Sequence, residues 1–198
     1  IYLTVTKDKK SQTTLRRIKN YQTDLNYLDK LNDTCRRICA DPPPIPEARR
    51  WMEEIKSKRY QTGIQAVVYA FVAASFSLFF GGRVRDAAIS AAIGIVLYFL
   101  DRWLAKLQLN RIFSVFVVSV LCGLIAAGTV RVGWGKNLAS ILIGDIMLLV
   151  PGLAITNSVR DMMKGDMLSG ILRLLESVLT AISMTIGFAI PQMLLGIL

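Results

Sequence analysis

The chain contains no histidine, the side chain that most often acts as a general base near neutral pH. Any proton transfer must therefore use Asp, Glu, Tyr or Lys. The sequence also lacks a nucleophile elbow, a phosphate-binding loop and a cluster of acids at metal-ligand spacing. Asp161 and Asp166 form an acidic pair without further acids at helical spacing beside them. These absences predict that the protein is not an enzyme and uses no metal or cofactor, although a membrane-embedded enzyme remains an alternative.

Cysteine is scarce, with three residues in 198. Cys35 and Cys39 are four residues apart, but no third metal ligand accompanies them, so we expect small buried residues in a reducing compartment. Cys122 lies in an apolar stretch and is expected to pack there. The cysteines thus predict neither a disulfide framework nor a metal site.

Charged residues are rare after residue 62, whereas 53% of the chain is hydrophobic and the mean hydropathy is +0.45. A transmembrane helix needs about 20 mainly apolar residues, because its backbone groups must bond within the segment. Asp86 and Asp101 are expected to snorkel from the ends of the second span. The fold class predicted is a membrane α-helical protein with five spans, at about residues 63–82, 87–104, 112–130, 138–159 and 167–198.

The distribution of Lys and Arg predicts the orientation. Placing the N-terminal region in the cytoplasm puts 20 basic residues inside and four outside, and it places the turn at residues 160–166 inside. A basic face beside anionic lipid accounts for the net charge of +10 without nucleic acid, so no nucleic-acid partner is expected.

Residues 1–62 are predicted to form a separate cytosolic α+β region. Residues 1–7 and 11–18 resemble two strands around a turn, and Thr23 or Asp24 is suited to cap a following helix. A proline-rich break at residues 41–46 then precedes a helix that leads to the membrane. Because the chain opens in mid-strand without Met, we expect this region to be N-terminally incomplete.

Small residues recur at helical intervals in the first two spans and predict close helix packing. They are Ala66, Ala70, Ala73, Ser77 and Gly81 in the first span, and Ala87, Ala91 and Gly94 in the second.

The last span has two faces of opposite character. The polar stripe comprises Asp166, Ser169, Arg173, Glu176, Thr180, Ser183 and Gly187. The apolar face comprises Leu168, Leu172, Leu175, Leu179, Ile182 and Ile186. Charged residues in a span usually face protein or water, so we expect Arg173 and Glu176 to point into a bundle and to pair with each other. The alternative is that both snorkel at the cytoplasmic interface.

The fourth span contains Pro151, which lacks an amide hydrogen, followed by Gly152. This pair predicts a kink or an unwound segment in mid-membrane, where transporters often bind ions or substrates. Asp145 is a candidate intramembrane proton site. The alternative is a packing kink, with Asp145 near the outer interface or paired with a neighbouring subunit.

A segment in the last third of the chain resembles the signature of the threonine/serine exporter family, PG-x-x-x-TN-x-x-RD-x-x-x-GD-x-x-SG-x-x-R-x-x-E. The residues that carry it are Pro151, Gly152, Thr156, Asn157, Arg160, Asp161, Gly165, Asp166, Ser169, Gly170, Arg173 and Glu176. The resemblance extends in outline to the whole chain, since the N-terminal half of that family has a mixed cytosolic region followed by five spans.

The resemblance implies an exporter of small carboxylate metabolites. Some similar proteins are fused to a second five-span half and export threonine and serine; others split the halves into two subunits, and one such pair is linked to succinate export. We therefore expect the larger subunit of the split type, in a higher oligomer with a smaller second membrane subunit, in a bacterial-type plasma membrane. A structural subunit without a substrate site remains an alternative.

Combined with the residue patterns, the resemblance assigns roles to individual side chains. Arg173 would hold a substrate carboxylate, and Asp145 or Glu176 would take up a proton as access alternates. The predicted substrate-binding residues are Thr156, Asn157, Arg173 and Glu176. The predicted gating residues are Pro151, Gly152, Arg160, Asp161, Gly165 and Asp166. For the turn at residues 160–166, anchoring and capping is the alternative to gating.

Overall fold

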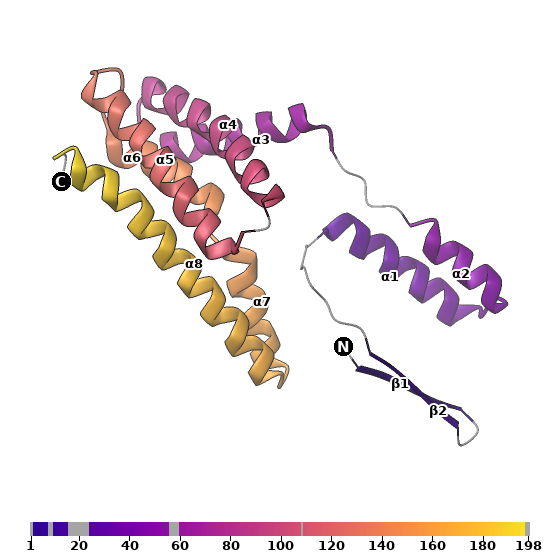
Figure 1. Ribbon diagram of the computed structural model, residues 1–198. Helices are drawn as coiled ribbons and strands as arrows, with labels where there is room; N and C mark the ends of the chain where they lie inside the picture. The colour runs from indigo at the N-terminus through magenta and orange to yellow at the C-terminus, as the bar shows by residue number, and fades with distance from the viewer. Residues whose placement is uncertain (1, 8–9, 16–23, 56–59, 108, 197–198) are drawn as a thin grey trace. The chain divides into compact units, whose positions relative to one another are not determined.

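The computed structural model describes residues 2–7, 10–15, 24–55, 60–107 and 109–196. The chain divides into two compact units, Ile1–Arg59 and Tyr60–Leu198, and each unit is described by itself (Figure 1).

The first unit contains a β-hairpin formed by β1 (Tyr2–Lys7) and β2 (Lys10–Leu15). The strands are antiparallel, and Thr4 pairs with Thr13, whose hydroxyl oxygen lies 3.1 Å from that of Thr4. The two strands predicted from the sequence are therefore present. Residues 16–18, at the end of the second predicted strand, lie outside the described residues.

The first unit also contains α1 (Leu25–Ala40) and α2 (Ile45–Glu53), which pack against each other. Asp24 caps α1, because its carboxylate accepts a hydrogen bond from the Tyr27 amide at 3.0 Å. The guanidinium of Arg37 lies 4.1 Å from the ring centre of Trp51, so a cation–π contact joins the two helices.

The expectation that Cys35 and Cys39 are buried is wrong, because both are exposed. No residue of α1 or α2 is buried among the described residues, and Leu25 and Leu28 are also exposed. The contact between α1 and α2 therefore leaves these side chains accessible.

The second unit contains six helices among its described residues: α3 (Thr62–Phe79), α4 (Val84–Lys106), α5 (Arg111–Arg131), α6 (Leu138–Leu149), α7 (Gly152–Met163) and α8 (Met167–Leu194). Four of them, α3, α4, α5 and α8, are long and apolar enough to cross a membrane. The pair α6 and α7 is bent by 50° and amounts to a fifth span if counted as one. The protein is thus a membrane α-helical protein, as the sequence predicted.

The helices of the second unit pack in two groups that meet in one core. α3 packs against α4 and α6, while α8 runs beside α5 and α7 (Figure 1). The core between them is formed by Ile93, Leu97, Leu104, Val115, Val118, Cys122, Ala126, Ile141, Leu142, Leu149, Met184 and Phe188.

Glycines allow the closest helix crossings. A Cβ built on Gly94 would lie 3.0 Å from both the Tyr69 carbonyl oxygen and the Ala73 Cβ, so α4 contacts the backbone of α3. A Cβ on Gly187 would lie 2.7 Å from the Ser119 Cβ, so α8 also lies close against α5. Ala73 and Gly94 of the predicted small-residue faces therefore meet each other, as close packing in membranes requires. Gly81 does not take part, because it lies beyond the end of α3 and a Cβ there would meet nothing within 4 Å.

Asp86 fixes the start of α4. Its side chain is fully buried and accepts hydrogen bonds from the amides of Lys136 at 2.7 Å, Asn137 at 3.3 Å and Arg83 at 3.0 Å. The expectation that Asp86 snorkels is therefore wrong, because the loop between α5 and α6 covers it with amide donors.

We predict that Asp86→Ala lowers the free energy of unfolding by about 3 kcal/mol, because it leaves the three amides without their charged acceptor. Unfolding of the purified protein in mixed micelles measures this change. Asp101→Ala, at the other end of the same helix, is the matched control, since Asp101 is partly exposed. An equal loss of stability in both variants would contradict the role assigned to Asp86.

Candidate functional site

The interruption between α6 and α7 lies at Val150 and Pro151. Pro151 has no amide hydrogen, so it cannot bond to the carbonyl of Met147, and α6 ends at Leu149. The Gly152 amide instead bonds to the Val150 carbonyl at 2.8 Å, and the Ile155 amide to the Pro151 carbonyl at 3.0 Å. The predicted break in the fourth span is thus present, and α7 leaves it at an angle of 50°.

A tight turn joins α7 to α8. The Gly165 amide bonds to the Met162 carbonyl at 3.0 Å, and the Asp166 amide to the Asp161 carbonyl at 3.0 Å. These two bonds form a Schellman motif, which requires a left-handed residue at its centre. Gly165 has a φ of 91°, so the glycine of the signature is explained by backbone geometry.

Gly170 brings α8 onto α7. A Cβ built there would lie 2.8 Å from the Ser158 carbonyl oxygen and 3.1 Å from the Met162 amide nitrogen, and it would also meet the Met162 Cγ. Both Gly170 and Ser158 are buried. The turn and this contact set the register of the two antiparallel helices.

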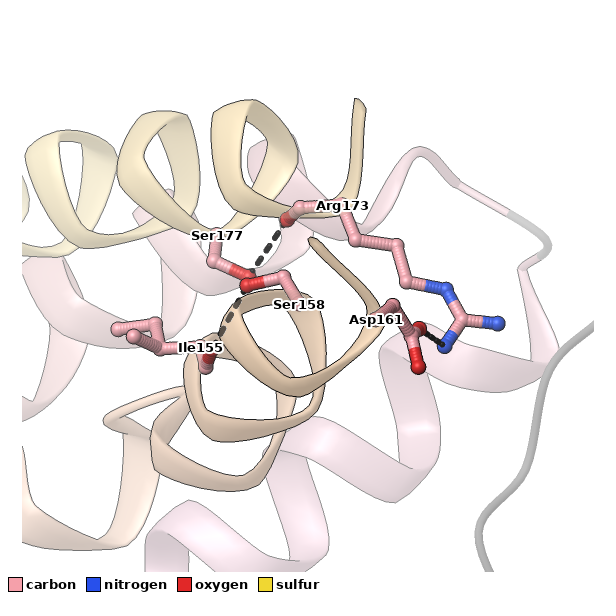
Figure 2. A network of polar contacts seen from close by, with 5 residues as sticks. All are labelled: Ile155, Ser158, Asp161, Arg173 and Ser177. Atoms are coloured by element: carbon pink, nitrogen blue, oxygen red, sulfur yellow. Dashed lines mark hydrogen bonds and ion pairs between the residues drawn. The ribbon is translucent and has the colours of Figure 1, made fainter. Parts of the chain in front are cut away.

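This register places Asp161 opposite Arg173 (Figure 2). One guanidinium nitrogen, Nη1, donates to Oδ2 of Asp161 at 3.1 Å. The Arg173 side chain is 47% exposed and that of Asp161 is 21% exposed. The sequence predicted that Arg173 would pair with Glu176 on its own helix, whereas the ion pair found connects α8 to α7.

The remaining predicted substrate-binding and gating residues lie on the same hairpin. The Thr156 hydroxyl donates to the Gly152 carbonyl at 3.0 Å, and Asn157 is partly buried one turn before Asp161. Besides Arg173, three charged residues of the signature are exposed: Arg160, Asp166 and Glu176. Thus the structure joins Arg173 to Asp161 directly and places the others along the two helices around this pair.

Asp145 lies on the other side of the break, in a different environment. α6 packs mainly against α3 and α4, and the Asp145 side chain is fully buried. Its Oδ1 lies 3.0 Å from the Ser90 Oγ of α4. The structure therefore does not unite Asp145 with Arg173 and Glu176, which are exposed on α8.

Sequence reasoning missed Ser90. It lies one turn after Asp86, on the same face of α4 as Gly94, so a polar residue on the packing face was the available signal. Sequence reasoning also missed an open cavity of about 620 Å³. The cavity is lined by Thr62, Ile95, Val96, Phe99, Leu100, Arg102, Trp103 and Lys106, none of which was a predicted site residue.

We predict that Gly170→Ala destabilises the protein by about 1–3 kcal/mol, because the new methyl group meets backbone atoms of α7 that cannot rotate away. The midpoint of unfolding in detergent measures the loss. Gly128→Ala on α5 is the matched control, because a Cβ there meets nothing within 4 Å. A midpoint for Gly170→Ala equal to that of the control would show that the hairpin is not closely packed.

Comparisons with known proteins identify a family for this chain. The chain matches the family described as "Putative threonine/serine exporter" over residues 1–195. It is 21% identical to a "Probable threonine/serine exporter" of Mycobacterium tuberculosis over 187 residues, which cover 93% of this chain and 35% of that protein. It is 24% identical to the "Uncharacterized protein C16A10.01" of Schizosaccharomyces pombe over 189 residues, which cover 88% of this chain and 22% of that protein.

The chain therefore spans about a third or less of the length of these two relatives. No solved structure matches it. Because the family match covers nearly all of its residues, the chain belongs to the threonine/serine exporter family of multi-pass membrane proteins.

Proposed function

We propose that this chain is part of a secondary exporter that moves small carboxylate metabolites out of the cytoplasm by alternating access. Threonine and serine are the first candidates, because the family and one relative carry these names. A dicarboxylate such as succinate belongs to the same chemical class. The observation that carries the proposal is the half-exposed ion pair between Arg173 and Asp161, held beside a broken span.

Membership of the family supports transport, and the geometry of the hairpin supports a carboxylate site. A guanidinium binds carboxylates through paired, charge-assisted hydrogen bonds. Arg173 already binds a carboxylate of the protein, that of Asp161, through one of its terminal nitrogens. Because the Arg173 side chain is 47% exposed, a substrate carboxylate can reach the same guanidinium from solvent.

In this proposal Asp161 holds the guanidinium while the site is empty, and the substrate carboxylate replaces it. An exposed ion pair contributes at most about 1 kcal/mol, so this exchange costs little. Thr156 and Asn157 bond the polar groups of the substrate, since both lie on α7 within two turns of Asp161. Glu176 lies one turn beyond Arg173 and attracts the ammonium of an amino-acid substrate.

The turn between α7 and α8 forms the inner mouth of the pathway, with Arg160, Asp161, Gly165 and Asp166 around it. Pro151 and Gly152 provide the hinge, because broken spans change their angle at such points. We place residues 1–62 on the cytoplasmic side of a bacterial-type plasma membrane, because this region is rich in Lys and Arg. A second five-helix membrane subunit completes the exporter in a higher oligomer.

We predict that Arg173→Ala weakens the apparent affinity for substrate by about 10- to 100-fold, because a charge-assisted hydrogen bond contributes about 1.5–3 kcal/mol. Arg173→Lys restores charge but not the planar pair of donors, so it recovers only part of this loss. The measurement is counterflow of labelled threonine, serine and succinate in membrane vesicles that contain the complete exporter. Arg131→Ala, at the end of α5, is the control. Wild-type counterflow in both Arg173 variants would refute the carboxylate clamp.

Exchanging the charges of Asp161 and Arg173 distinguishes a substrate-binding role of Arg173 from a purely structural role of the ion pair. The combination of Asp161→Arg with Arg173→Asp rebuilds the pair but moves the guanidinium to α7. We expect this double variant to assemble as wild type and to remain defective in counterflow. If the exchange restores counterflow, the pair stabilises or gates the hairpin and Arg173 does not hold the substrate.

A further inference from the structure

The Asp145 carboxyl group is enclosed by three helices. It is fully buried on α6, and its Oδ1 lies 3.0 Å from the Ser90 Oγ of α4. Its Oδ2 has no hydrogen-bond partner among the described residues. Within the same residues, no Lys or Arg lies within ion-pair distance of the carboxyl group. The surroundings therefore provide no charge to balance an ionised Asp145.

The two short contacts of the Ser90 hydroxyl limit the protonation state of Asp145. Its Oγ is 3.0 Å from Oδ1 of Asp145 and 3.2 Å from the Ala73 carbonyl oxygen of α3. A serine hydroxyl has one hydrogen to donate. If Asp145 is ionised, both neighbours of Ser90 are acceptors, and one of the two short contacts has no hydrogen.

A proton on Asp145 resolves this shortage. The carboxylic acid then donates to the Ser90 Oγ, and Ser90 donates to the Ala73 carbonyl, so both contacts are hydrogen bonds. Neutralisation also avoids burying a charge without a partner, which is more costly than protonation. Asp145, Ser90 and the Ala73 carbonyl thus form two hydrogen bonds when Asp145 is protonated and one when it is ionised.

We propose that Asp145 is a proton-binding site that is occupied in this conformation and releases its proton only when α6 separates from α3 and α4. This inference builds on the proposed function by assigning the coupling proton to Asp145 and Ser90 and not to Glu176. The ligand proposed for the Asp145 carboxyl group is a proton. An alkali cation is the alternative ligand that the experiments below must exclude.

Packing at the neighbouring Gly144 explains why separation is required. A Cβ built on Gly144 would lie 2.5 Å from the Ser90 Oγ, 2.6 Å from the Ala73 carbonyl oxygen and 3.1 Å from the Ser77 Cβ. The three helices therefore touch at the level of the carboxyl group. Water or a hydrated cation reaches Asp145 only after this contact opens.

The groups around Asp145 favour a protonated carboxyl group, because none of those named below supplies a positive charge. α3 contributes the Ser77 hydroxyl, which is buried without a hydrogen-bond partner among the described residues, and α5 contributes the Cys122 thiol. On α4, Asp86 lies one turn before Ser90, and backbone amides already satisfy its carboxylate. From α8, no group lies within hydrogen-bond distance of Oδ2 among the described residues.

Infrared spectroscopy of the purified full-length protein tests the protonation state directly. Wild-type protein with isotope-labelled aspartate is expected to show a protonated carboxyl stretch at neutral pH that Asp145→Asn removes. Ser90→Ala should shift this band to higher frequency, because the acid loses its acceptor. Asp101→Asn, the matched control on α4, should leave the band in place. If wild type lacks a band that depends on Asp145 and Ser90, the site is ionised and the inference is wrong.

Transport in vesicles tests what the proton does. Asn has the shape of the protonated acid but cannot release a proton, so Asp145→Asn should retain counterflow and lose accumulation driven by a pH gradient. Gradient-driven accumulation at the wild-type level in this variant would overturn the coupling role. Accumulation in wild type that follows a sodium gradient at clamped pH would identify an alkali-cation site and also overturn it. Absence of counterflow in wild type would refute the proposed exporter, while the infrared result would still decide whether Asp145 binds a proton.

Discussion

The absence of an amide hydrogen at Pro151 is the constraint that organises the membrane unit. Inside a bilayer no water replaces the lost backbone bond, so the helix must end or bend where the bond is missing. α6 ends at Leu149, and α7 continues at 50° to it. Each half then packs on different neighbours, α6 on α3 and α4, and α7 on α8. The polar residues of the unit are divided in the same way, with a buried acid before the break and an exposed ion pair after it.

Comparison of three carboxyl groups shows how their surroundings determine what each can do. Asp86 is fully buried, but three backbone amides surround its oxygens, so its charge is balanced by donors and its role is structural. Asp161 is partly exposed and faces a guanidinium, so water and Arg173 share its stabilisation. Asp145 is as buried as Asp86, but among the described residues it has a single hydrogen-bond partner, the Ser90 hydroxyl, which also contacts a carbonyl. Burial alone therefore does not distinguish these carboxyl groups, whereas the number of donors around each one does.

The sequence was sufficient to predict the elements that depend on local composition. Long apolar runs identified the spans, Pro151 identified the break, and the period of α8 separated its exposed leucines from Thr180 and Gly187, which are buried. It was not sufficient for contacts between elements. Arg173 and Glu176 are neighbours on one helix, yet the Schellman turn and Gly170 fix a register that brings Asp161 to Arg173 from 12 residues away. Likewise, the depth of Asp145 depends on how α3 and α4 enclose α6, and a helical period cannot specify which helices do so.

The two ends of α6 are held differently, which would determine how α6 moves if the angle at the break changed. At its start, the Ser140 hydroxyl bonds to the Phe80 carbonyl at 3.1 Å, and Asp86 binds the preceding loop. At its end, Leu149 packs in the core, and the chain continues into the segment around Pro151, where the backbone ladder is interrupted. A helix fixed at one end and hinged at the other moves most at the hinged end. Such a movement would open the contact at Gly144 and, through the same hinge, shift α7 with Asp161. Proton release and rearrangement of the Arg173 ion pair would then be two consequences of one rotation, which is the coupling that a proton-driven exporter requires.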